Sequence, residues 1–475
     1  MDLNMTLSKA VETVEQTIKN KDKIKVITHC DVDGLTSYTI LKKTLDRLEA
    51  DFDINYISHV SDETLDKLEL NEYDLILFAD LGSSSLHTLD KHKALHGKTV
   101  IILDHHYPLE ITPNFKLIHV NPNLCGYTGD SSACGATLSY LFAREFGYTD
   151  LAKYAILGAI GDAQSSNSGC LEDFNLTPIH DMKNELVVEN ALQLYGKFSR
   201  PLILALKYSS NIFSDFNESD NNVLAFLYKI LKETGVDIPY HKPYCRLSDK
   251  HIKILSTYLY KYMKKFIPKE FHKVVNQCLY GKSYHLNEDI ENIIKTPWKY
   301  DFEEMPSFLN ASIRIKQYDL VANYLLSGKN EKMLYNNYRK YKQKLSISIR
   351  SFDQLCEYDQ LSNIQYYIAY TDSGIDTTMS GVLAGMLYSK PYFSYVKPNI
   401  GIVEFEDGWK ISIRGSKILQ YTTFHAGHIL IKLSEKYNGS AGGHKLAAGS
   451  LLDYNVDLDK YIQDLNTTCY YNILI

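Results

Sequence analysis

The chain of 475 residues is 45% hydrophobic and 23% charged, which predicts two to four globular domains and excludes a disordered chain. Its formal net charge of −6 lacks the basic excess that is typical of nucleic-acid-binding proteins. That sum hides an uneven distribution, because residues 251–350 hold 18 Lys and Arg against 9 Asp and Glu, so the middle is basic and the flanks are acidic.

Eight cysteines are scattered along the chain and never form a C-x-x-C pair. This spacing indicates neither a zinc ribbon nor a disulfide framework. The N-terminus has no apolar leader, and no later window offers the roughly 20 apolar residues of a membrane span. We therefore expect a protein of the reducing cytoplasm that does not engage a membrane.

The N-terminal segment, from Lys23 to about Tyr195, alternates short apolar runs with helix-like stretches. The runs KIKVIT, YDLILFA and TVIIL are predicted strands, and SYTILKKTLDRLEA and ATLSYLFAREFG are predicted helices. Strands that alternate with helices predict an α/β domain with a doubly wound parallel sheet.

The middle of the chain, from about 200 to 345, shows no strand alternation and carries helical periodicity instead. From about residue 360 strands return in NIQYYIAYT, in NIGIVEFEDGWKISIRG with its Asp407-Gly408 hairpin signal, and in AAGSLL, beside a helix in TFHAGHILIKLSEKY. We therefore predict an α/β domain over 1–200, a mostly helical basic connector or inserted module over 201–350, and a smaller α/β domain over 351–475.

Acids and imidazoles stand where the apolar runs of the N-terminal segment stop. In an open α/β sheet the carboxyl ends of the strands form the ligand crevice, so such side chains converge on one site. The spacing i, i+2, i+4 of the first three would point them the same way in extended backbone, and Gly34 then permits a turn into a helix whose N-terminus suits a phosphate. The candidate residues are His29, Asp31, Asp33, Asp80, Asp104, His105, His106 and Asp162.

Each of these residues has an ordinary explanation when it is taken alone, because a single Asp at a strand end commonly caps a helix or a turn. Four such features in order favour one shared site. Carboxylate and imidazole ligands without a thiolate suit Mn²⁺ or Mg²⁺ better than structural zinc. Two such ions about 3.5–4 Å apart activate a water and stabilise both oxygens of a phosphoester displacement.

A glycine-rich stretch with a histidine, Gly439 to Gly449, lies near the C-terminus. Consecutive glycines let backbone N–H groups form an anion nest, and Arg414 in WKISIRGS is a plausible bidentate phosphate partner. Taken alone, the stretch is weak evidence, because an ordinary glycine turn with a hydrogen-bonded histidine is the commoner explanation. The basic helices of the middle segment either attract a polymeric phosphodiester or simply expose a charged helix face to solvent.

The strings VITHCDVDGLTS, LILFADLGSS, IILDHHYP and LGAIGDAQ resemble the four motifs of the DHH-family phosphoesterases. The resemblance implies a pair of Mn²⁺ ions, or Mg²⁺ in their place, with one carboxylate shared between them. It also implies that the second histidine of the triplet contacts the scissile phosphate and that the preceding aspartate supports the site. The implied roles are His29, Asp31 and Asp80 for one ion, Asp33, Asp80, His105 and Asp162 for the other, His106 for the phosphate and Asp104 for support.

The C-terminal stretch and its arginine resemble the GGH-x-x-AAG signature of the DHH-associated C-terminal domain, which grips the substrate. The segment Gly196 to Phe213 is similar to one that follows the DHH domain in archaeal RecJ-like nucleases. The resemblance therefore implies substrate-binding roles for Arg414, Gly442, Gly443 and His444.

The function that this resemblance implies is a Mn²⁺-dependent exonuclease that hydrolyses single-stranded DNA or RNA from an end. One alternative is a nano-RNase or cyclic-dinucleotide phosphodiesterase of the same superfamily, although its relatives lack so long a middle segment. Another is a replication scaffold, because the family includes an inactive helicase subunit and archaeal relatives bind the GINS complex.

Overall fold

The computed structural model describes residues 2–166, 168–375, 377–389, 393–405 and 408–474. The chain divides into two compact units, which we call unit 1 (Met1–Glu189 and Lys282–Arg339) and unit 2 (Asn190–Gly281 and Lys340–Ile475). The predicted segment 201–350 is therefore shared between both units, and its residues 282–339 pack with the N-terminal part of the chain.

Unit 1 is built on a parallel five-stranded sheet of order β2-β1-β3-β4-β5, as the alternating pattern predicts. Strand β2 lies on one side of β1, and β3, β4 and β5 follow on the other side. The strand order therefore reverses between β1 and β3. The strands are β1 (Ile24–His29), β2 (Phe52–Ile57), β3 (Leu75–Ala79), β4 (Thr99–Leu103) and β5 (Lys116–Val120).

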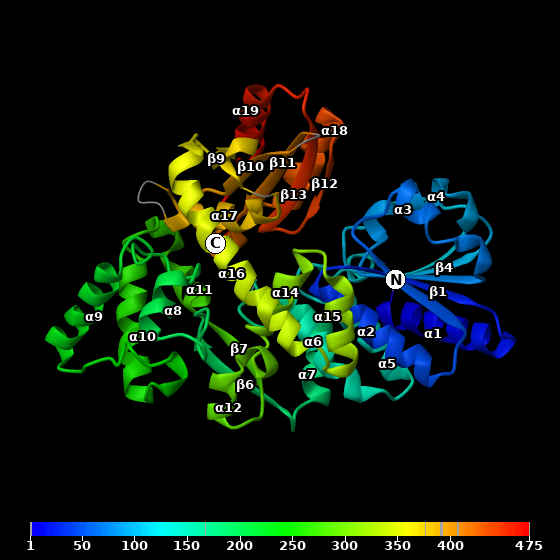
Figure 1. The fold of residues 1–475 in the computed structure, drawn as a ribbon, viewed down its shortest axis with the longest axis horizontal. Helices are drawn as coiled ribbons and strands as arrows, with labels where there is room; N and C mark the ends of the chain where they lie inside the picture. The colour runs from blue at the N-terminus through cyan, green and yellow to red at the C-terminus, as the bar shows by residue number, and fades with distance from the viewer. Residues whose placement is uncertain (1, 167, 376, 390–392, 406–407, 475) are drawn as a thin grey trace. The chain divides into compact units, whose positions relative to one another are not determined.

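Helices cover both faces of this sheet (Figure 1), with α1, α2 and α5 on one face and α3 and α4 on the other. Strand β3 reads LILFA and is buried throughout, as a strand covered on both faces must be. The helices of unit 1 before residue 190 are α1 (Leu3–Asn20), α2 (Val32–Arg47), α3 (Asp62–Asp66), α4 (Leu86–Lys91), α5 (Gly135–Glu145), α6 (Ala152–Gly161) and α7 (Leu176–Asp181).

The returning segment 282–339 adds helices that pack on α2 and α6 through a shared apolar cluster. These helices are α12 (Ile290–Lys295), α13 (Pro297–Tyr300), α14 (Met305–Ile313) and α15 (Tyr318–Ser327). A two-stranded sheet of β6 (Leu186–Leu192) and β7 (Tyr280–Leu286) lies where the chain leaves and re-enters unit 1. The middle segment is thus mostly helical, but β7 is a strand that its sequence pattern does not reveal.

Unit 2 combines helices with a mixed six-stranded sheet of order β12-β13-β11-β10-β9-β8. Its strands are β8 (Glu357–Gln360), β9 (Gln365–Ala369), β10 (Asn399–Phe405), β11 (Gly408–Arg414), β12 (Ser440–Gly443) and β13 (Ala447–Asp453). The helices before residue 281 are α8 (Leu202–Tyr208), α9 (Asp220–Thr234), α10 (Asp249–Met263) and α11 (Val275–Leu279). Those after it are α16 (Glu331–Leu355), which begins in unit 1, α17 (Ser380–Met386), α18 (Ala426–Tyr437) and α19 (Leu458–Thr468).

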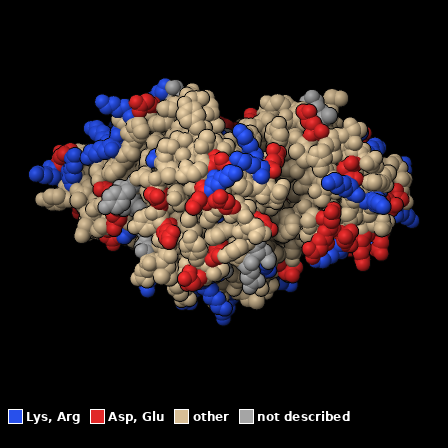
Figure 2. Space-filling model, turned by 90° about the horizontal axis from the view of Figure 1, so that it is seen from above, with Lys and Arg blue, Asp and Glu red and all other residues tan. Residues whose placement is uncertain are grey.

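The predicted hairpin of β10 and β11 is confirmed by the antiparallel pairing of Phe405 with Gly408, and Asp407 lies outside the described residues. Charged side chains of both signs are interspersed on the face that Figure 2 shows. Among the described helices, none is long and apolar enough to cross a membrane.

Candidate metal centre

The predicted acids and imidazoles of unit 1 gather at the carboxyl ends of β1, β3 and β4. This is the edge at which the strand order reverses between β1 and β3, and open α/β sheets form their ligand crevice at such a point. Two of the groups of potential ligands found there correspond to the two predicted ion sites, and the ligand atoms of each group lie within 4.8 Å of one another.

The first group consists of His29 at the end of β1, Asp31 and Asp80. The Nδ1 atom of His29 lies 3.1 Å from Oδ2 of Asp31 and 3.5 Å from Oδ2 of Asp80. Among the described residues, neither His29 Nδ1 nor Asp80 Oδ2 has a hydrogen-bond partner, although both atoms are buried. Buried polar atoms normally have partners, so these two atoms fit a site that binds a cation.

The second group consists of Asp33, His105 and Asp162. The Nε2 atom of His105 lies 3.7 Å from Oδ2 of Asp162 and 3.9 Å from Oδ2 of Asp33. It also lies 3.4 Å from Oδ1 of Asp80. One oxygen of Asp80 therefore faces each group, which is the arrangement of a carboxylate that bridges two ions.

The backbone around Asp80 is shaped for this role. Asp80 follows β3 directly and has a φ of 61°, in the left-handed region that aspartate tolerates better than most residues. Gly135, at the start of α5, packs against it so closely that a Cβ there would lie 2.4 Å from the Asp80 Cβ. A glycine is therefore required beside the bridging carboxylate.

Asp33 is held by the N-terminus of α5. Its Oδ2 accepts a hydrogen bond of 2.7 Å from the Gly135 N–H, and its Oδ1 accepts one of 2.8 Å from the Ala136 N–H. Helix N-termini favour negative charge, so α5 both orients and stabilises this carboxylate.

The orientation of His105 follows from a hydrogen bond on its other ring nitrogen. Nδ1 lies 2.8 Å from the Gly129 carbonyl, which can only accept, so Nδ1 carries the hydrogen and Nε2 is directed at the three carboxylates. The Gln164 side chain donates to the same carbonyl and to Oδ2 of Asp162, each at 2.8 Å. Such outer hydrogen bonds fix the ring orientation of metal-binding histidines.

The carboxylates of the cluster repel one another, and this repulsion shifts the pKa values of the site residues. Burial and the neighbouring Asp80 and Asp162 carboxylates raise the pKa of Asp33 well above its ordinary value. Burial alone would lower the pKa values of His29 and His105, but the surrounding carboxylates raise both well above the ordinary value. Bound cations relieve such repulsion, so the donor set fits divalent metal ions with oxygen and imidazole ligands.

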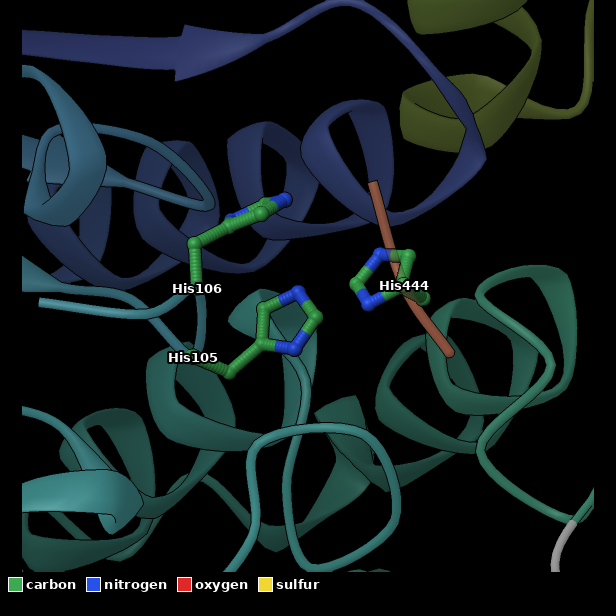
Figure 3. Close-up of side chains that lie close together, drawn as sticks. All are labelled: His105, His106 and His444. Carbon is green, nitrogen blue, oxygen red and sulfur yellow. The ribbon is translucent and has the colours of Figure 1, made fainter. Parts of the chain in front are cut away.

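His106 follows His105 on the loop that leaves β4, and Figure 3 shows the two rings next to one another. Their centroids are 4.5 Å apart. The Nδ1 atom of His106 lies 2.8 Å from Oδ1 of Asp104. Asp104 is fully buried and also accepts from the backbone N–H groups of Ser83 and His105. Burial would raise the pKa of Asp104, but His106 and these donors hold it well below its ordinary value. Asp104 is thus an ionised support that orients His106.

Two details of the predicted geometry are wrong. Asp31 is the N-cap of α2 and keeps extended dihedrals, but Asp33 lies in the first turn of the helix, so the three residues do not share one extended segment. The helix begins here because Oδ1 of Asp31 accepts from the Gly34 N–H at 2.9 Å. Asp162 follows helix α6 and not a strand, because the apolar run before it packs on α2 and α5.

Sequence reasoning missed the polar residues that support the histidine loop. The Asn121 side chain donates to the His106 carbonyl and to Ser83 Oγ, at 2.8 and 2.9 Å. The Asn123 side chain donates to the His105 carbonyl at 2.8 Å. A signal for Asn121 was present, since it is a polar residue directly after the apolar run of β5.

The predicted substrate-binding residues lie in unit 2, on or next to strands β12 and β11, which flank β13 in its sheet. Gly442 and Gly443 belong to strand β12 and pair with β13, so the predicted loop is a hairpin whose turn contains His444. The carbonyl of His444 accepts from the Gly427 N–H at the start of α18. Arg414 ends β11, and its Nη1 donates to the Ile413 carbonyl at 2.7 Å. Their role in binding stays a prediction.

The N-terminal part of the chain matches a known family. Residues 23–161 match the model described as the DHH family, N-terminal domain. An uncharacterized protein of Methanocaldococcus jannaschii is 28% identical over 456 residues, which span 94% of each chain. The single-stranded-DNA-specific exonuclease RecJ of Bacillus subtilis is 25% identical over 221 residues, which span 45% of this chain and 26% of that protein.

Solved structures share the fold of the chain. RecJ of Thermus thermophilus in complex with Mn²⁺ gives a TM-score of 0.55 at 16% identity, over 98% of this chain and 54% of that chain. Cdc45 of Entamoeba histolytica gives a TM-score of 0.60 at 13% identity, over 98% of this chain and 99% of that chain. The chain thus spans about half the length of the Thermus protein and about a quarter of the Bacillus protein.

Proposed function

We propose, from the premise that this chain is a RecJ-like protein of the DHH family, that it is a Mn²⁺- or Mg²⁺-dependent exonuclease acting on single-stranded DNA or RNA. The observation that carries the proposal is the placement of the two Asp80 oxygens, one toward His29 and the other toward His105. A bridging carboxylate between two ligand groups is the arrangement used for in-line displacement at phosphorus.

Two divalent ions bound at this centre would activate a water and neutralise charge on the scissile phosphate. The residues His29, Asp31 and Asp80 would hold one ion, and Asp33, Asp80, His105 and Asp162 the other. His106 would contact the phosphate through its other ring nitrogen, because Asp104 holds Nδ1 and fixes the ring from the other side. In unit 2, Arg414, Gly442, Gly443 and His444 would hold the rest of the strand.

The decisive variant is Asp80→Asn, which keeps the size of the side chain and tolerates positive φ. We expect it to abolish Mn²⁺-dependent degradation of an end-labelled single strand while the thermal unfolding of the chain stays cooperative. The matched control is Asp237→Asn, an exposed carboxylate of unit 2, which should leave the rate unchanged. Undiminished hydrolysis by purified Asp80→Asn would refute the proposal.

Substrate length separates this proposal from a nano-RNase or cyclic-dinucleotide phosphodiesterase. A length series of matched DNA and RNA oligonucleotides, read at nucleotide resolution, should show long strands shortened from one end. A preference for dinucleotides over long strands would favour the alternative instead.

A second candidate function is a replication scaffold that binds the GINS complex, and the likeness to Cdc45 over nearly the whole of both chains favours it. The two functions differ in their need for metal. A purified chain that binds GINS subunits, contains no metal and binds no Mn²⁺ in a calorimetric titration would support the scaffold over the nuclease.

A further inference from the structure

Unit 1 contains a cavity of about 460 Å³ between α2, α6 and the helices of the returning segment. Its lining is basic and apolar, and no acidic side chain of the described residues lines it. Lys43 on α2 lines the cavity ten residues after Asp33, which corresponds to about 15 Å along the helix axis. The cavity is therefore separate from the metal centre.

Three lysines line this cavity: Lys43, Lys153 near the start of α6 and Lys299 on α13. Lys299 is paired with Glu331 at 2.7 Å, so its charge is compensated. Lys153 is exposed and forms no ion pair with the described acidic residues. Burial, followed by the nearby Lys153 and Arg47 charges, lowers the pKa of Lys43, while the Asp150 and Asp46 carboxylates act in the opposite direction.

The C-terminal end of helix α15 forms one wall of the cavity, and two of its backbone carbonyls already accept hydrogen bonds from side chains of the protein. Lys43 Nζ donates to the Leu326 carbonyl at 3.0 Å, and the Tyr154 hydroxyl donates to the Leu325 carbonyl at 2.9 Å. The C-terminal carbonyls of this helix are thus already bonded, and an ammonium group with three donors keeps two of them after the Lys43 bond. The exposed Lys153 Nζ lies 5.0 Å from the centroid of the Tyr154 ring.

The rest of the lining is apolar or aromatic. Leu157 and Phe302 are buried and form its floor, beside Met305. The rings of Tyr154 and Tyr324 add flat surfaces. Ligand pockets of about 300–1,000 Å³ with an apolar lining and a few convergent polar groups are typical of small-molecule sites.

We propose that this cavity binds a nucleoside polyphosphate, with its phosphates on Lys43 and Lys153 and its base against the aromatic and apolar wall. Ammonium groups bind phosphates as point charges, and aromatic rings of the lining stack on bases. The volume of about 460 Å³ and the aromatic wall favour this ligand over an acidic peptide, which needs an extended groove. The proposal does not depend on the nuclease activity.

The test is fluorescence anisotropy of methylanthraniloyl-labelled ATP titrated with the full chain, in EDTA so that no ion joins the nucleotide to the metal centre. Lys153→Glu should weaken binding at least about tenfold, the loss expected when one charged contact is reversed. The control Lys295→Glu makes the same charge change on α12 of unit 1, outside the cavity lining, and should stay within about twofold.

A second variant, Ser327→Trp, tests the cavity itself without changing charge. Ser327 is an exposed residue of the lining at the end of α15, so a tryptophan there should fill the space and abolish binding while the melting temperature stays unchanged.

Unlabelled ATP should displace the probe better than adenosine or inorganic triphosphate. The proposal is overturned if the probe does not bind at millimolar protein, if both cavity variants bind as the wild type does, or if a poly-glutamate peptide displaces it better than ATP.

Discussion

The glycine beside the bridging carboxylate provides the sharpest test of the metal-centre geometry. We predict that Gly135→Ala disables the centre although it adds only one methyl group. Gly135 does not have a left-handed φ, so alanine suits the backbone and the effect arises from the new Cβ alone. That Cβ would lie 2.4 Å from the Asp80 Cβ and 2.8 Å from its Cα.

The expected magnitude follows from these distances. Carbon atoms normally approach to about 3.5–4.0 Å, so Asp80 or the start of α5 must move by about 1 Å. Overpacking of this kind costs about 1–3 kcal/mol of the free energy of unfolding. A displacement of about 1 Å at a reacting centre costs about 100-fold in rate, so we expect at least that loss of hydrolysis.

The assay is Mn²⁺ titration calorimetry together with hydrolysis of an end-labelled single strand and thermal unfolding. Gly385→Ala is the control, because nothing lies within 4 Å of the Cβ position on that helical glycine of unit 2. Wild-type metal affinity and rate in Gly135→Ala would show that the bridging position of Asp80 does not matter for function.

Three further predictions concern the surroundings of the centre and the stability of the fold. Gln164→Leu removes the hydrogen bond to Asp162, and we expect about a 10–100-fold loss of Mn²⁺ affinity by calorimetry. Asp181 accepts hydrogen bonds from Arg144 Nε at 2.6 Å and from Tyr140 Oη at 2.5 Å. These donors lower the pKa of Asp181 in the folded chain. The ionised carboxylate therefore stabilises the fold at neutral pH, and this contribution is lost as the pH falls. Asp181→Asn should therefore lower the free energy of unfolding by about 1–3 kcal/mol at neutral pH. Urea titrations should show that the difference between wild type and variant shrinks below about pH 4. A difference that does not change with pH would contradict the stabilising role of the Asp181 carboxylate. Mn²⁺ at a concentration of one hundred times its dissociation constant should raise the free energy of unfolding by about 2.7 kcal/mol. EDTA should reverse this increase, and the Asp80→Asn variant should not show it.

Much of the N-terminal architecture is readable from local pattern. Apolar runs that alternate with amphipathic stretches predict a parallel sheet, because each strand must be buried on both faces. The acids and imidazoles after β1, β3 and β4 could then be grouped without a structure, since parallel strands end at one edge. His29, Asp80 and His105 lie together for this reason.

Tertiary packing decided the remaining features of the site and the division into units, because contacts between distant segments leave no local pattern in the sequence. Asp33 reaches the centre from a helix and Asp162 from a helix end, and Gly135 is required only because α5 packs on the bridging carboxylate. Residues 282–339 look like part of one helical segment in the sequence, yet they join unit 1 and close the lysine-lined cavity. Residue types and their positions at the ends of predicted strands thus indicated where the metal-binding residues gather, whereas the close approach of helices set the geometry of the site.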